Sequence, residues 1–199
     1  LQDEVNSLRE KVVEAIAEVD DSLLERYLGG EEINLEELDK GLRKGVVTGK
    51  IIPILAGSGL QNIGMGLLLN AISRYMPSPK EHGVSAVGAA GKIEILEPAA
   101  DAPLAALVFK TTADPYVGKL TYFRVYRGSL ASNSQVWNST RNEFERIGQL
   151  YLIRGKTQEP VAAIGTGDIG AVAKLSTTGT GDTLCPHEKP VKLAPLVFP

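Results

Sequence analysis

The chain has 199 residues, of which 43% are hydrophobic, and a net charge of −3; this suits one large or two small globular domains. No segment approaches the roughly 20 apolar residues of a membrane span, and no basic region precedes an apolar run as in a signal peptide. The single cysteine, Cys185, cannot form an internal disulfide. We therefore expect a reducing, cytoplasmic location, without a membrane partner.

Charge divides the chain in two. Residues 1–79 carry 8 Lys and Arg against 13 Asp and Glu, whereas residues 80–199 carry 13 against 11. This asymmetry predicts two units with different surfaces. The mildly basic second unit permits contact with nucleic acid, although a solvated surface explains the same charge. Helical spacing starts almost at the first residue, without a start methionine, so we expect a piece of a longer protein.

The first unit has the pattern of an α/β domain. Helices are expected over residues 3–19, 23–28, 35–44 and 63–75. Asp21 or Ser22 would cap the second helix, and Asn34 with Glu37 forms a capping-box pattern before the third. The apolar run Ile51–Leu55 predicts a strand buried on both faces. Helices alternating with a buried strand indicate the end of an α/β domain.

After Pro77-Ser78-Pro79 the pattern changes. Residues 80–100 read as a linker with one short strand over 92–96. Beyond them, β-branched and aromatic runs alternate with Gly, Asn, Asp and Pro, which is typical of a barrel or a sandwich. The strands expected there cover residues 105–112, 119–127, 135–138, 144–154, 161–164, 169–174 and 183–185. Alternation from Leu120 to Arg127 puts 121, 123, 125 and 127 on one face and 122, 124 and 126 on the other.

Two glycine motifs resemble nucleotide-binding loops. Gly165–Gly170 matches GxGxxG, but a short strand rather than a helix follows it, so we interpret it as a turn between strands. Gly155-Lys156-Thr157 mimics the end of a phosphate loop, but Leu150 stands where the first glycine is required. We therefore expect an exposed hairpin tip at that position.

No catalytic or metal-binding cluster is visible. The only histidines, His82 and His187, lie in loops, and one cysteine does not make a zinc site. Trp137 is interpreted as barrel packing, with base stacking as the alternative. Aspartates beside Pro or Gly are interpreted as turn caps rather than acids or bases; they are Asp114, Asp168 and Asp182.

Several motifs together carry a family resemblance. Asp168–Ala171 and Thr178–Cys185 follow Phe109–Gly128 in an order that resembles the second domain of elongation factor G, a translational GTPase. In the first unit, the segments Tyr27–Glu31, Ile54–Leu60 and Leu67–Pro79 are similar to that family's acidic insert, last guanine-contacting loop and closing helix. The resemblance covers nearly the whole chain.

The resemblance implies a fold and a partial nucleotide site. The fold would be the α/β tail of a P-loop GTPase domain (1–79), a linker and first strand (80–100), and an antiparallel β-barrel of the translation-factor type (101–199). Ser58, Gly59 and Leu60 fall on the guanine loop, where backbone amides approach the base. The longer parent would bind GTP and Mg²⁺. This chain lacks GxxxxGK[ST], so we expect it neither to bind GTP tightly nor to hydrolyse it.

For the barrel, the resemblance implies docking on the ribosome through small-subunit ribosomal RNA, and no DNA partner. Basic residues could supply salt-sensitive phosphate contacts; they are Lys119, Arg124, Arg127, Arg141, Arg146 and Arg154. Leu150–Gly155 lacks a Met-His pair common in the family, and Lys174 replaces a usual glycine. These departures resemble elongation-factor-G-like paralogues. The alternatives are a ribosome-protection or release-type GTPase, a stand-alone RNA-binding barrel, and a structural barrel that binds proteins.

Overall fold

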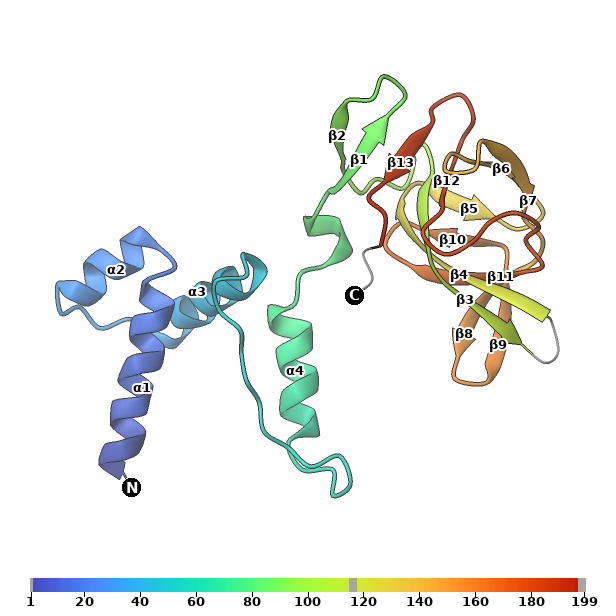
Figure 1. Ribbon diagram of the computed structural model, residues 1–199. Helices are drawn as coiled ribbons and strands as arrows, with labels where there is room; N and C mark the ends of the chain where they lie inside the picture. Colours follow the sequence, from blue (N-terminus) through green and yellow to red (C-terminus); the bar gives the residue numbers. More distant parts are fainter. Residues whose placement is uncertain (1, 115–117, 197–199) are drawn as a thin grey trace. The chain divides into compact units, whose positions relative to one another are not determined.

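The computed structural model describes residues 2–114 and 118–196 (Figure 1). The chain forms two compact units, Leu1–Pro77 and Ser78–Pro199. The first unit is helical and the second consists mainly of antiparallel strands. Each unit is described separately below.

The first unit contains the four expected helices, α1 (Gln2–Ala17), α2 (Asp21–Leu28), α3 (Leu35–Val47) and α4 (Met65–Tyr75). The capping box of α3 is present, with the Asn34 side chain accepting from the Glu37 amide at 3.0 Å. The expected cap of α2 was wrong by one residue. Asp20 caps this helix, because its carboxylate accepts from the amides of Ser22 and Leu23 at 3.1 and 3.4 Å.

A small core joins α1 to α3. Ile16 and Val19 are buried there. The two glycines of α3 make the close approach possible. A Cβ on Gly41 would lie 2.7 Å from the Ile16 Cγ2 atom, and one on Gly45 would lie 2.6 Å from the Ile51 Cδ1 atom.

The strand predicted at Ile51–Leu55 was wrong, because these residues are extended coil. Ile52 is 83% exposed and Ile54 is 94% exposed. A strand needs a hydrogen-bonded neighbour, and no described residue of this unit pairs with the run. Other apolar side chains of the unit are also exposed, namely Val5, Leu8, Val12, Leu60, Leu67 and Leu69.

The described residues of the second unit form three sheets of antiparallel strands, with the orders β13-β1-β2, β10-β5 and β7-β6-β12-β3-β4-β11-β8-β9. Their bounds are β1 (Val84–Gly88), β2 (Ile93–Leu96), β3 (Ala105–Asp114), β4 (Gly118–Arg127), β5 (Ser129–Ala131), β6 (Gln135–Asn138), β7 (Glu143–Arg146), β8 (Leu150–Arg154), β9 (Thr157–Val161), β10 (Ala163–Gly165), β11 (Ile169–Ala173), β12 (Thr183–Cys185) and β13 (Val191–Leu193).

Two strand predictions need correction. The strand expected over 144–154 is two strands, β7 and β8, which the segment Ile147–Gln149 separates. Here the Ile147 amide bonds to the Ser134 carbonyl, and the Gln149 side chain bonds to the Val161 carbonyl at 2.9 Å. The strand expected over 161–164 corresponds to β10, and its first residue, Val161, instead ends β9, whose residues 157–160 were not predicted as a strand. Three short strands, β1, β5 and β13, were not predicted.

The main core lies inside the eight-stranded sheet and the strands that close over it. It is apolar, with Val108, Phe123, Leu150, Val172 and Leu184 at its centre. The alternation predicted for β4 is confirmed over residues 121–126, because 121, 123 and 125 are buried while 122, 124 and 126 are half-buried. It fails at Arg127, which is half-buried, because the pairing of β3 with β4 shifts register at this end of the strand. A smaller core lies between the three-stranded sheet and the start of β3.

The interpretation of both glycine motifs is confirmed. Gly165–Gly170 spans the turn between β10 and β11, and Gly155, with φ of 60°, stands at the tip of the β8–β9 hairpin. Cys185 on β12 is buried, and this burial raises the pKa of its thiol. No helix within the described residues is long and apolar enough to cross a membrane.

Candidate nucleic-acid interface

The outer face of the eight-stranded sheet carries two tyrosines and a lysine in one row, with a small, fully buried alanine between the tyrosines. Register places Lys110 of β3 opposite Tyr122 of β4, Tyr122 opposite Ala171 of β11, and Ala171 opposite Tyr151 of β8. Directly opposed residues of antiparallel strands project to the same face. We call Lys110, Tyr122, Ala171 and Tyr151 the tyrosine row.

The cations of this face lie against aromatic rings. The Lys110 ammonium is 5.8 Å from the centroid of the Tyr122 ring, and the Arg124 guanidinium is 5.1 Å from that of Tyr126. The Arg124 Nε atom is enclosed and has no hydrogen-bond partner. Each contact is within the range of cation–π attraction, which holds the basic group near the ring.

Two hollows border the tyrosine row. One, of about 450 Å³, is lined by Tyr122, Leu152, Ile153, Arg154, Ile169 and Gly170. The other, of about 440 Å³, is lined by Arg146, Gly148, Gln149, Tyr151, Ala173, Lys174 and Ser176. Each hollow therefore combines one tyrosine of the row with at least one basic side chain.

This arrangement has the chemistry of a single-stranded nucleic-acid surface. Tyrosine rings offer stacking platforms for bases, and Arg or Lys beside them can contact the phosphates. The face carries Arg124, Arg146 and Arg154, three of the six basic residues singled out from the sequence; Arg154 also forms an exposed ion pair with Glu159 at 3.6 Å. Sequence reasoning missed Lys110 and Tyr151, because the register that aligns them with Tyr122 is a long-range property.

The other three basic residues do not belong to this face. Lys119 donates to the Thr178 carbonyl at 2.6 Å, and Arg141 pairs with the buried Asp182 at 3.1 Å. Both therefore hold the loop between β11 and β12. Arg127 lines a separate pocket beside the three-stranded sheet.

A buried carboxylate organises the same loop. Glu145 of β7, which is 3% exposed, accepts from the amides of Ser176, Thr177 and Thr178, each at 3.0 Å. The Thr178 hydroxyl also donates to it at 2.8 Å. Burial alone would raise the pKa of Glu145, but these hydrogen bonds outweigh it and hold the pKa below its usual value. Asp182 is the turn cap expected, because the Gly179 amide donates to its carboxylate at 2.8 Å.

In the first unit, Ser58, Gly59 and Leu60 lie in a loop before α4. The Ser58 and Ile63 backbones exchange hydrogen bonds of 2.9 and 3.0 Å, and the Ser58 hydroxyl accepts from the Gln61 amide at 3.3 Å. Leu60 is 97% exposed. The loop is thus a closed turn whose tip is open to solvent. Among the described residues, no group of His, Cys, Asp and Glu side chains is arranged to hold a metal ion.

Comparison with known proteins agrees with this architecture. Residues 103–187 match the family model described as elongation factor G domain 2. The chain is also similar to the crystal structure of ttk003000868 from Thermus thermophilus, with 33% sequence identity and a TM-score of 0.71. That match covers 95% of this chain and 26% of the Thermus chain, so this chain spans about a quarter of that protein's length.

The second unit is thus a β-barrel module of the kind found in translation factors. The barrel is an elongation factor G domain 2, and the chain belongs to the elongation factor G family of translation factors.

Proposed function

We propose that this chain is part of a translational GTPase that acts on the ribosome, and that the outer face of its barrel contacts small-subunit ribosomal RNA. The observation that carries the RNA contact is the tyrosine row with Arg124, Arg146 and Arg154 around it, on a barrel that is an elongation factor G domain 2. Tyrosine rings beside arginines suit single-stranded RNA better than an acidic protein surface, because the rings can stack on bases while the arginines contact phosphates.

The first unit would be the end of the GTPase domain. Its exposed extended run at Ile52–Ile54 supports this assignment, because such a run could complete a sheet whose other strands belong to a longer protein. The turn at Ser58–Leu60 would then present backbone amides to guanine, and GTP with Mg²⁺ would bind only in that longer protein. Cytoplasmic location is part of the same proposal.

The RNA contact is testable by cosedimentation of the chain with small ribosomal subunits over a series of salt concentrations. We expect the affinity to fall as salt rises, and Arg124→Gln or Arg154→Gln to weaken binding. We define the salt slope as the magnitude of the slope of log binding constant against log salt concentration. Each variant should also lower this slope by about 0.7–0.9 for every phosphate that it no longer neutralises. Lys192→Gln, a matched removal of one exposed charge on β13, should leave the slope unchanged. Binding without salt dependence would instead favour a barrel that contacts proteins.

Nucleotide binding separates the GTPase assignment from its rivals. We expect calorimetric titration of this chain with GTP to detect no micromolar binding, because the phosphate loop is missing from the sequence. A gene product that extends this chain with a phosphate loop should bind GTP tightly. If the gene encodes no such loop, the stand-alone RNA-binding barrel is the correct assignment. If it does, the order of the remaining domains would distinguish a translocase, or a paralogue of one, from a ribosome-protection or release factor.

A further inference from the structure

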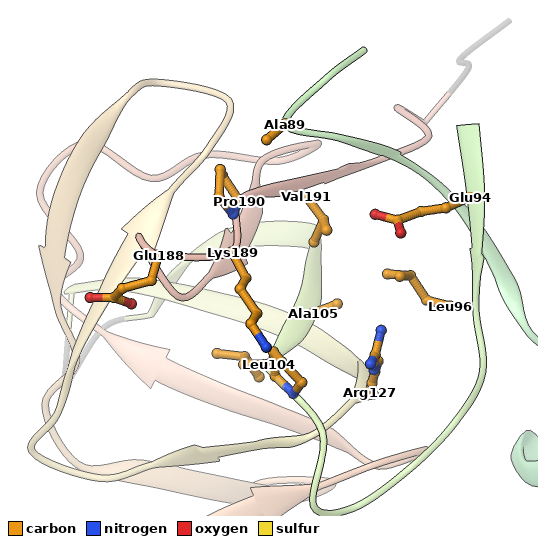
Figure 2. Close-up of a pocket in the computed structure, with 11 residues that line it drawn as sticks. Ala89, Glu94, Leu96, Leu104, Ala105, Arg127, Glu188, Lys189, Pro190 and Val191 are labelled. Carbon is orange, nitrogen blue, oxygen red and sulfur yellow. The ribbon is translucent and has the colours of Figure 1, made fainter. Parts of the chain in front are cut away.

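A pocket of about 380 Å³ lies between the three-stranded sheet and the start of β3, outside the face proposed for RNA (Figure 2). Its walls are apolar where they meet the two sheets, with Leu96, Leu104 and Val191 among the lining residues. Charged residues complete it, namely Glu94, Arg127, Glu188 and Lys189. The volume falls within the range of pockets that hold small molecules.

The charged groups of this pocket are not paired with one another. Arg127 and Lys189 extend into the pocket on either side of Ala105, Glu94 lies near Leu96, and Glu188 points away from the others (Figure 2). None of the ion pairs found within residues 2–114 and 118–196 involves these four side chains. The two cations therefore line a partly apolar cavity, and neither is ion-paired with Glu94 or Glu188, the two carboxylates that also line it.

Arg127 has one buried donor without a partner. Its Nε atom is enclosed by protein and has no hydrogen-bond partner. The guanidinium has therefore given up water on that side without gaining an acceptor, which is costly for a charged donor. The part of the Arg127 guanidinium that lines the pocket is nevertheless available to an oxyanion, because the planar group matches carboxylate and phosphate geometry.

We propose that this pocket binds a small organic anion, whose carboxylate or phosphate group pairs with Arg127 and Lys189 and whose apolar part contacts Leu96, Leu104 and Val191. Lys189 is exposed and can adjust to the ligand, whereas Arg127 is held by its place at the end of β4. The anion can be a free organic acid or the carboxylate at the end of a peptide chain. The proposal is independent of the RNA contact, since it involves neither the tyrosine row nor Arg124.

The test is an NMR titration of the full chain, observing the Arg127 Nε–Hε resonance, with 4-methylpentanoate as the probe and 4-methylpentanamide as its neutral match. We expect the acid to shift this resonance and the amide to leave it in place. Inorganic phosphate should bind more weakly than the acid, because it lacks an apolar part. A short peptide ending in a free leucine carboxylate tests the second source: whichever of peptide and acid binds more tightly identifies where the anion comes from.

Variants complete the test. Arg127→Gln should weaken binding of the acid about tenfold or more, as the loss of a charge-assisted hydrogen bond requires. Lys189→Gln should also weaken binding of the acid. Because Lys189 is exposed, this variant should fold normally, so the test remains valid if Arg127→Gln fails to fold. Lys156→Gln removes a charge from the β8–β9 hairpin tip and should have no effect. Equal binding of acid and amide, or no response to Lys189→Gln, would overturn the proposal.

Discussion

Glu145 shows how one buried carboxylate orders a loop from another part of the chain. Its partners, Ser176–Thr178, lie more than 30 residues further along the sequence. No local pattern marks this role, since the residue reads as one more polar position on a strand. The same holds for Arg141 and Asp182, whose pairing fixes Arg141 to the loop between β11 and β12.

We predict that Glu145→Gln destabilises the barrel by about 1–3 kcal/mol at neutral pH, because the amide cannot accept every donor that faces the carboxylate. The folded-state pKa of Glu145 lies below its usual 4.5, so the carboxylate stabilises the fold fully above that value and progressively less as the pH falls through the folded-state pKa. Urea unfolding of variant and parent should therefore differ most at neutral pH and converge in acid.

The control for this prediction is Glu143→Gln, on the same strand but exposed. It should change the free energy of unfolding by less than about 0.5 kcal/mol. A Glu145→Gln variant as stable as the Glu143→Gln variant would contradict the role given to the loop hydrogen bonds.

At the scale of the elements, the spacing of apolar residues predicted where strands occur, but it did not predict where one strand is interrupted and the next begins. Strands such as β6 and β12 coincide with their predicted bounds, because turn residues flank a short β-branched or aromatic run. The division of β7 from β8 depends on contacts of Gln149 with a distant carbonyl, which no local pattern encodes. Only part of the tyrosine row could be predicted from the sequence. Alternation indicated the outward side chains of β4, but only the strand register aligns them with Tyr151.

Lys174, where the resemblance led us to expect a glycine, has a backbone conformation that favours glycine. Its φ of 60° lies in the left-handed region, which glycine occupies without strain. The lysine thus carries a conformational cost at the end of β11 and places a positive charge in the hollow beside Tyr151.

Gly128, directly after β4, is a position where both conformation and space require glycine. Its φ is 71°, and a Cβ there would lie 2.5 Å from the Ala102 carbonyl oxygen and 2.9 Å from the Leu104 Cα. We predict that Gly128→Ala lowers the free energy of unfolding by at least about 2 kcal/mol, because backbone strain and the clash with main-chain atoms add together.

Gly155→Ala is the matched comparison in denaturant unfolding, since its φ of 60° is similar but nothing lies within 4 Å of its Cβ position. It should cost about 1–2 kcal/mol from the backbone alone. Equal losses for the two variants would show that the close approach of Ala102 and Leu104 does not matter.

For the whole molecule, the two units differ in how much apolar surface they bury. The second unit has an extended core, whereas the first buries little beyond Ile16, Ala17 and Val19 and leaves the apolar side of α1 in water. We predict that native-state hydrogen exchange finds the strongest amide protection in β3, β4 and β11, and only weak protection in α1. Protection in α1 equal to that in β4 would contradict this prediction.

The same contrast explains what could be inferred about the fold from sequence. The barrel and its position in the chain were predictable, because its strands satisfy one another within the chain. The strand prediction at Ile51–Leu55 was wrong for the opposite reason. An apolar run shows that a segment is suited to a buried strand, but not that a partner strand is present, and no described residue of this chain pairs with the run.

The buried thiol of Cys185 has a practical consequence. As the chain's only sulfhydryl, it is sealed inside the barrel and has a raised pKa, so a colorimetric disulfide reagent can reach it only in molecules whose barrel has opened. At a reagent concentration high enough for reaction to outpace reclosing, the rate of colour development equals the rate of opening. The protein thereby carries its own built-in reporter, without any engineered label.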